Sequence, residues 1–159
     1  MPKKSAGLLV YREAANGSGI EVLLVHPGGP FWRNKDEGAW TIPKGEFDDG
    51  EEPLEAAKRE FNEELGSVPP VGEYFPLNPI KQKNHKTVHA WAVKGDFDPA
   101  TLKSNTFSCE WPPKSGRMQE FPEVDRAQWF APDKAKRKII LAQGELIDEL
   151  LTILMSPQS

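Results

Sequence analysis

The sequence has only one cysteine, Cys109, in 159 residues, which excludes an internal disulfide bond. It also lacks any apolar run that approaches the length of a transmembrane helix. Its first residues, MPKKSAGLLVYRE, become polar too soon for a secretory signal peptide. We therefore expect a protein of a reducing compartment, most simply the cytoplasm, with no membrane partner.

Positive charge is also in short supply. Lys and Arg number 20 against 24 Asp and Glu, which gives a formal net charge of −4. Binding to a nucleic acid backbone needs a basic footprint, so we expect no nucleic acid polymer as a partner. Small phosphorylated substrates are not excluded, because a metal ion can offset their charge. The length, the 38% of hydrophobic residues and the lack of repeats or linkers predict a single domain, residues 1–159.

Carboxylates, in contrast, are concentrated in one stretch. Seven of the 24 acidic residues lie between positions 49 and 64. Like charges repel, so a folded protein keeps such a cluster for solvation or for a cation. The segment from about Pro53 to Leu65 reads as a helix, with Asp48 or Asp49 as its cap and Gly66 after its end.

This predicted helix has two stripes at about 100° per residue. Glu60, Glu63 and Glu64, spaced i, i+3 and i+4, lie beside the apolar packing stripe. Converging carboxylates destabilise a helix unless a positive group joins them, and a hard divalent ion, Mg²⁺ or Mn²⁺, fits best. A solvated acidic face is the alternative. The packing stripe consists of Leu54, Ala57, Phe61 and Leu65.

The glutamates belong to a longer pattern: a glycine, five residues, a glutamate, seven residues, then Arg-Glu-apolar-x-Glu-Glu-x-Gly. Its fixed positions are Gly45, Glu51, Arg59, Glu60, Phe61, Glu63, Glu64 and Gly66. This pattern resembles the Nudix box, here residues 45–67, and the chain is similar to Nudix hydrolases. One position departs from the family, which has an aliphatic residue where this chain has Ser67.

The resemblance implies an α+β fold, an α/β/α sandwich with a mixed β-sheet. It also implies metal-dependent cleavage of a diphosphate linkage in a nucleoside diphosphate joined to another group. The lead-in Pro43–Gly45 resembles Nudix enzymes that act on dinucleoside polyphosphates, so this substrate class is placed first. Nucleoside triphosphates, including oxidised ones, come second and nucleotide sugars third. A nucleotide-binding module without catalysis is the alternative from another class, and the complete set of box carboxylates argues against it.

The resemblance further implies roles for the box residues. Glu63 and Glu64 are the expected main metal ligands, and Glu60 is a ligand or the general base. The carbonyl group of Lys44 is expected to complete the metal shell. Arg59 is expected to orient a glutamate through a two-point contact. The remaining box positions are expected to be structural: Gly45, Glu51 and Gly66.

Nudix enzymes often supply one further glutamate from a loop before a late strand. Residues 127–130, AQWF, look like that strand, and their position favours Glu123 over Glu120. The segment before them, residues 114–125, predicts a long polar functional loop. Arg117 in this loop is a candidate phosphate ligand.

A second set of candidate substrate contacts precedes the box. Phe31 and Trp32 lie in the Gly- and Pro-rich loop 27–38, and they either stack on a base or anchor the loop on the core. The side chain of Lys44 is a candidate for neutralising a phosphate, with solvation as the alternative.

The rest of the chain predicts the scaffold. Segments 5–12 and 20–26 are short, apolar and β-prone, and the turn residues 16–19 separate them. Alternation over residues 88–93 predicts another strand, and the apolar spacing over 146–154 predicts a covering helix. The basic turn before residue 88 is a hairpin tip or a phosphate-binding rim; it contains Lys81, Lys83, His85 and Lys86. The oligomeric state is left open.

Overall fold

The computed structural model describes residues 3–17, 19–82 and 86–155. Two residues of the predicted basic turn, Lys83 and His85, lie outside the described residues. No helix within the described ranges is long and apolar enough to cross a membrane.

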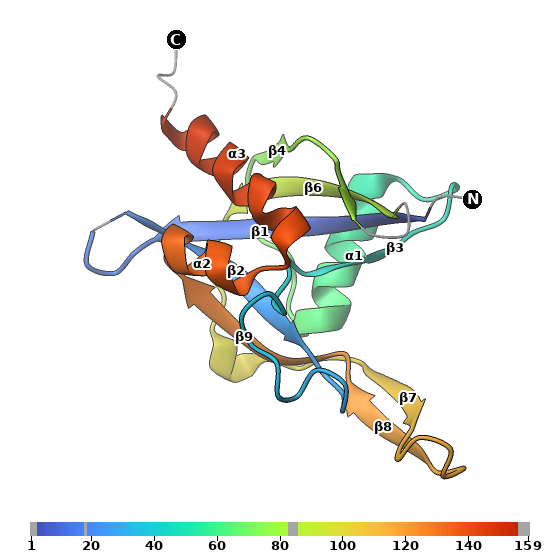
Figure 1. The fold of residues 1–159 in the computed structure, drawn as a ribbon. Coiled ribbons are helices and arrows are strands. Elements are labelled where there is room, and N and C mark those ends of the chain that lie inside the picture. The colour runs from blue at the N-terminus through green and yellow to red at the C-terminus, as the bar shows by residue number, and fades with distance from the viewer. Residues whose placement is uncertain (1–2, 18, 83–85, 156–159) are drawn as a thin grey trace.

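The centre of the fold is a mixed sheet (Figure 1). Its main path runs β4 (Tyr74–Pro76), β6 (Lys86–Lys94), β1 (Lys4–Glu13), β2 (Ile20–Pro27) and β9 (Val124–Phe130). Strand β3 (Lys44–Glu46) also pairs with β1, and β5 (Ile80–Gln82) also pairs with β6. The β1 and β6 strands are parallel, whereas the other named pairs are antiparallel.

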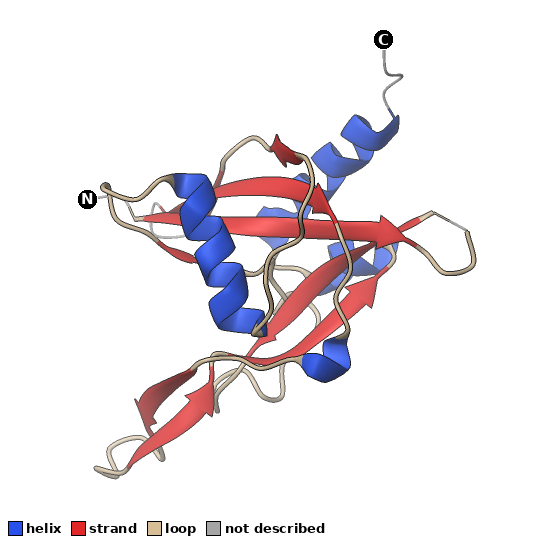
Figure 2. Cartoon of the chain, turned by 180° about the vertical axis from the view of Figure 1, so that it is seen from behind, coloured by secondary structure: helices blue, strands red, loops and turns tan. Residues whose placement is uncertain are grey.

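Strand β1 contributes alternate residues to two cores. Ala6, Leu8 and Val10 pack on the side of α1 (Pro53–Leu65), whereas Leu9 and Tyr11 pack on the opposite side. Because helices cover both faces of the sheet, this strand reads as one apolar run rather than as an alternating pattern. Figure 2 shows α1 in front of the sheet, and Figure 1 shows the C-terminal helices on the other face.

Those C-terminal helices are α2 (Pro132–Lys138) and α3 (Gly144–Met155). Short 3₁₀ turns at Pro99–Thr101 and Leu141–Gln143 complete the helical elements of the described residues. In α3, Leu146, Ile147 and Leu150 are buried in the core, as the predicted stripe requires. Leu154 from the same predicted stripe is largely exposed. The α/β/α sandwich expected from the sequence is therefore confirmed.

The start of α1 differs from the expectation. Its N-cap is Glu52, without a side-chain cap hydrogen bond, so neither Asp48 nor Asp49 caps it. Instead, Asp49 pairs with Lys4 at 2.7 Å. The helix ends at Gly66, whose φ of 73° is a left-handed conformation that favours glycine.

The prediction of a long loop at residues 114–125 is also wrong in part, because a strand lies within this segment. Strands β7 (Thr106–Glu110) and β8 (Met118–Pro122) form a separate two-stranded hairpin that projects from the body of the fold (Figures 1 and 2). Phe107 pairs with Phe121, but the residues around them are polar and exposed. That composition is typical of a loop, which is why the pattern concealed β8. We call residues 106–122 the hairpin arm.

Candidate active site

Strand β3 brings the first box glycine against helix α1. A Cβ atom on Gly45 would lie 2.1 Å from the side-chain Cδ and Oε2 atoms of Glu60. Glu60 is a buried charged residue, so its carboxylate is held between the helix and the β3 backbone. The box therefore has glycine at this position because the Glu60 carboxylate fills the space that any side chain needs.

Arg59 connects the carboxylates of the box. Its Nε and Nη2 atoms donate to the two carboxylate oxygens of Glu51 at 3.2 Å each, which is a two-point contact. Its Nη1 atom donates to Glu60 Oε1 at 2.8 Å and to Glu63 Oε1 at 3.3 Å. Glu51 also accepts a hydrogen bond from the amide of Asp48. One guanidinium group thus joins the loop before α1 to two glutamates of the helix.

The backbone of Lys44 lies beside the third glutamate. Its amide donates to Glu64 Oε1 at 3.3 Å. The Lys44 side chain packs close to Gly7, where a Cβ atom would lie 2.6 Å from the Lys44 Cβ. Burial lowers the pKa of Lys44, and the charge of Lys86 lowers it further. Two ammonium groups are therefore neighbours at the edge of the carboxylate cluster.

Lys86 is a site residue that sequence reasoning did not single out. It is the first residue of β6, and its Nζ atom lies 3.5 Å from Glu46 Oε2. The basic turn that contains Lys86 was consistent with a phosphate-binding rim, but it was also consistent with a hairpin tip. Only the pairing of β1 with both β3 and β6 places Lys86 near Lys44.

Burial and neighbouring carboxylates raise the pKa of three glutamates. Burial raises the pKa of Glu60, and the charge of Glu63 adds to the effect. Burial raises the pKa of Glu64 well above its usual value, and the charge of Glu60 adds to it. Burial also raises the pKa of Glu123, again with a contribution from Glu63. Burial is the largest cause for each of the three, and Glu123 from outside the box interacts electrostatically with the box glutamates.

Backbone hydrogen bonds explain how Glu123 reaches the box. The amide of Asn105 donates to the Glu63 carbonyl at 2.9 Å, and the amide of Glu123 donates to the Asn105 carbonyl at 2.8 Å. Glu120, in contrast, pairs with Ser108 within the hairpin arm. Of the two late glutamates, the structure brings Glu123 to the cluster.

This placement makes a prediction. Glu123→Gln is expected to lower turnover by about tenfold or more, because a carboxylate that helps to hold a metal ion matters at least as much as residues that only orient metal ligands. Glu120→Gln is the matched control and should retain normal activity. Steady-state kinetics over a range of Mg²⁺ concentrations would test both. Loss of activity in the Glu120 variant alone would reverse the assignment.

The residues fit a divalent ion by their chemistry. Among the described residues, no three His, Cys, Asp or Glu side chains are arranged as a ready metal site. The guanidinium of Arg59 instead provides positive charge to Glu60 and Glu63. All nearby donors are carboxylate or carbonyl oxygens, which suit Mg²⁺ or Mn²⁺ rather than softer metals. Burial and neighbouring carboxylates raise the pKa of Glu60 and Glu64, and a bound cation would favour their charged forms.

The predicted substrate contacts outside the box form a separate group. Phe31 makes an edge-to-face contact with Trp111, with ring centroids 5.5 Å apart. The Nζ atom of Lys35 lies 5.3 Å from the ring centroid of Trp32. Arg117 lies in the exposed turn of the hairpin arm. Sequence reasoning did not select Trp111 as a substrate contact, although Phe107, Cys109 and Trp111 recur at every second residue, a spacing that places them on one face of an extended segment.

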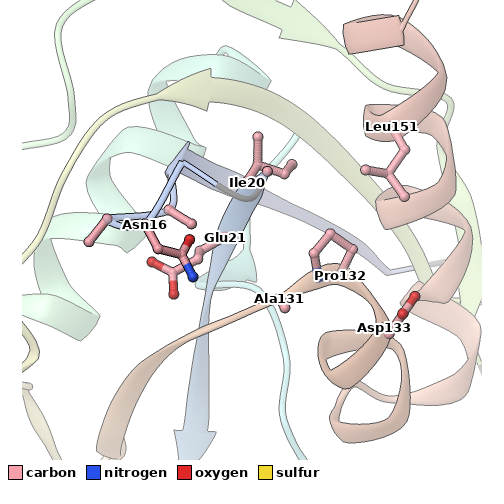
Figure 3. A pocket seen from close by; sticks show the side chains of 10 residues that line it. Asn16, Ile20, Glu21, Ala131, Pro132, Asp133 and Leu151 are labelled. Carbon is pink, nitrogen blue, oxygen red and sulfur yellow. The ribbon is translucent and has the colours of Figure 1, made fainter.

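Two surface hollows lie near the ends of the sandwich. One of about 690 Å³ is lined by the β1–β2 connection and the start of α2, with Ile20, Pro132 and Leu151 among its walls (Figure 3). It contains no box residue, so it is not the candidate active site. A hollow of about 520 Å³ is lined by Glu55, Lys58 and Arg59 of the box, but by none of the candidate metal-binding glutamates.

Known proteins share this sequence and fold. Residues 1–150 match the NUDIX domain. An 8-oxo-(d)GTP phosphatase of Mycolicibacterium smegmatis is 34% identical over 108 residues, which are 60% of this chain but only 31% of that protein. A bis(5'-nucleosyl)-tetraphosphatase (asymmetrical) of Rattus norvegicus is 34% identical over 62% of this chain and 69% of its own. An RNA pyrophosphohydrolase of Brucella anthropi is 31% identical over 70% of this chain and 67% of its own.

Solved structures agree with the sequence relatives. A binary complex of Ap4A hydrolase from C. elegans has a TM-score of 0.64 at 22% identity and covers 94% of this chain and 97% of its own. Another crystal structure of C. elegans Ap4A hydrolase has a TM-score of 0.60 at 26% identity, with 97% and 99% covered. The family and the fold expected from the box are therefore both confirmed. The chain belongs to the NUDIX family and is a Nudix hydrolase.

Proposed function

We propose that this protein uses a divalent metal ion, Mg²⁺ or Mn²⁺, to hydrolyse a phosphoanhydride bond in a nucleoside diphosphate linked to another group. The observation that supports the proposal is the complete set of box glutamates on one helix, with Glu123 held next to that helix. Glu60, Glu63 and Glu64 come from α1, and Glu123 joins them through the Asn105 backbone. Burial raises the pKa of Glu60, Glu64 and Glu123, a bound cation would favour their charged forms, and a diphosphate needs a cation to offset its own charge.

Each residue then has a role. Glu63 and Glu64 would hold the ion together with the Lys44 carbonyl and Glu123. When bound, the ion neutralises the diphosphate and makes an attacking water molecule a better nucleophile. Glu60 would act as a further ligand or as the base that accepts the proton of that water. Its raised pKa and its fixed position against β3 suit proton transfer.

Two lysines support binding of the phosphates. The side chains of Lys44 and Lys86 lie close enough for the charge of Lys86 to lower the pKa of Lys44. Neighbouring ammonium groups repel one another, so an anion between or beside them is stabilised. We propose that they contact the phosphate groups that do not contact the metal ion.

Dinucleoside polyphosphates are the substrate class placed first. The lead-in Pro43–Gly45 favours them, and the rat relative is named a bis(5'-nucleosyl)-tetraphosphatase. The second candidate is pyrophosphohydrolysis of nucleoside triphosphates, because the mycobacterial relative is named an 8-oxo-(d)GTP phosphatase. A non-catalytic nucleotide-binding module is the third possibility, and the complete carboxylate set opposes it.

The test is product release from a panel of substrates. Diadenosine tetraphosphate, ATP, GTP, 8-oxo-dGTP and ADP-ribose would each be incubated with Mg²⁺, with Mn²⁺ and with a chelator. We expect metal-dependent cleavage that is highest for the dinucleotide and absent with the chelator. A clear preference for 8-oxo-dGTP would favour the second candidate. Binding without any cleavage, measured by thermal shift, would favour the non-catalytic module.

A further inference from the structure

The hairpin arm extends the candidate active site outward. Its strands contain five residues each, so they reach about 17 Å at about 3.4 Å per residue. Neither strand pairs with the main sheet in the described structure, and the arm projects from the body (Figure 2). Two-stranded hairpins are marginally stable alone, so other contacts must hold the arm in place.

The root of the arm is hydrogen-bonded to the backbone of Glu63, a proposed metal ligand. Asn105 before the arm donates to the Glu63 carbonyl at 2.9 Å, and Glu123 follows the arm directly. The amide of Gly28 donates to the Glu123 carbonyl at 3.0 Å, so the loop after β2 leaves from the same point. Buried His26 fixes this loop, because its ring nitrogens bond to Asp125 at 2.8 Å and to the Lys35 carbonyl at 2.6 Å.

One face of the arm is aromatic and free of carboxylates. Successive strand residues point to opposite faces, and opposed residues of paired strands share a face. Phe107 and Phe121 share one face, whereas Glu120 with Ser108 and Glu110 with Met118 share the other. The aromatic face lies toward the loop after β2, because a Cβ atom on Gly29 would lie 2.8 Å from the Phe107 ring.

At the outer end of this face, Trp111 lies against Phe31 and Arg33 of the loop after β2. We define these three residues, with Trp32 and Lys35 of the same loop, as the platform. Phe31 is 60% exposed and Trp32 is 37% exposed, so their rings are open to a ligand. Phe31 packs edge-to-face on Trp111, and the guanidinium of Arg33 lies 6.0 Å from the Trp111 ring centroid. Exposed aromatic rings stack on nucleobases, and adjacent cations attract the phosphates attached to them.

We propose that this platform binds the distal nucleoside of a dinucleoside polyphosphate while its phosphate chain crosses the carboxylate cluster. The proposal rests on the proposed function and names its substrate class. The nucleoside whose phosphate is attacked must lie next to the cluster, but Trp111 lies a whole strand away from Asn105 and Glu63. A polyphosphate chain with a second nucleoside at its far end spans that separation. A nucleoside triphosphate has no second nucleoside for the platform.

The experiment compares two substrates that differ only in the distal nucleoside: diadenosine tetraphosphate and adenosine tetraphosphate. Trp111→Ala and Phe31→Ala are expected to raise KM for the dinucleotide about tenfold, as loss of one stacked base does. Both variants should cleave adenosine tetraphosphate like the wild type. Trp111→Phe keeps a ring and should recover most of the lost affinity.

Controls separate stacking from folding. Met118 is 66% exposed on the opposite face of the arm, so Met118→Ala should behave as the wild type with both substrates. If Trp111→Ala disrupts the arm, the loop variant Phe31→Ala still tests the platform, and melting temperatures would distinguish the two cases.

The outcomes are distinct. Equal losses with both substrates, or no loss with either, would overturn the platform assignment while the enzyme remains a hydrolase. A dependence on Trp111 seen only with a 5'-triphosphorylated RNA would also overturn it. If the wild type cleaves neither tetraphosphate under any metal condition, the proposed function fails first and the platform assignment fails with it.

Discussion

Glu63→Gln is expected to lower turnover by at least about 100-fold while the fold remains intact. Residues that only orient metal ligands contribute about 10- to 100-fold, and a direct ligand should contribute no less. Glutamine keeps the shape of the side chain but removes the charge that would hold the ion. The loss of stability should be small, because the contact of Glu63 with Arg59 is partly exposed and weak at 3.3 Å.

The measurement is kcat at saturating Mg²⁺, accompanied by melting curves with and without the metal. Metal binding should raise the melting temperature of the wild type and should have little effect on the variant. Glu55 is an exposed glutamate in the first turn of the same helix, so Glu55→Gln is the matched control with normal turnover. Near-normal turnover in the Glu63 variant would refute the metal-ligand role.

Gly45→Ala is expected to lower turnover by about 100-fold, the loss that a misplacement of about 1 Å at a reactive group can cause. The added Cβ atom would lie 2.1 Å from the Glu60 carboxylate, so that carboxylate must move. The fold should tolerate the change, because the displaced atoms form the end of a side chain and Gly45 has no positive φ. We therefore expect Gly45→Ala to lose turnover while its melting temperature stays close to that of the wild type.

Gly50→Ala is the matched control, because a Cβ atom there would meet no atom within 4 Å. It lies in the same loop between β3 and α1 and should retain both activity and melting temperature. Comparison of kcat and melting temperature for the two alanine variants is the measurement. A fully active Gly45→Ala enzyme would show that the position of the Glu60 carboxylate is not required for the reaction.

Local sequence was sufficient for much of the site. The box spacing identified Glu60, Glu63 and Glu64 because residues three and four apart share a helix face whatever surrounds the helix. The same spacing named Arg59 and Glu51, which the structure joins through two hydrogen bonds. The apolar runs of β1 and β2 and the stripe of α3 likewise predicted burial, since periodicity depends only on local geometry.

The pairing that forms the hairpin arm was not predictable in this way. Its second strand, β8, is short and polar, and the pairing depends on Phe107 meeting Phe121 across a turn. The N-terminus of α1 was also misassigned, because Asp49 pairs with Lys4 from another strand rather than with the helix. In both places a contact distant in sequence decided the local structure.

The sequence by itself determined the family, the helix that carries the box glutamates and the apolar strands of the sheet. The tertiary structure decided which distant residues join them. Strand pairing placed Lys86 near Lys44, and backbone bonds through Asn105 hold Glu123 next to the box helix. The tertiary structure also placed Trp111 in contact with Phe31. These neighbours are set by strand register and by long-range hydrogen bonds, and a periodic pattern within one segment holds no information about either.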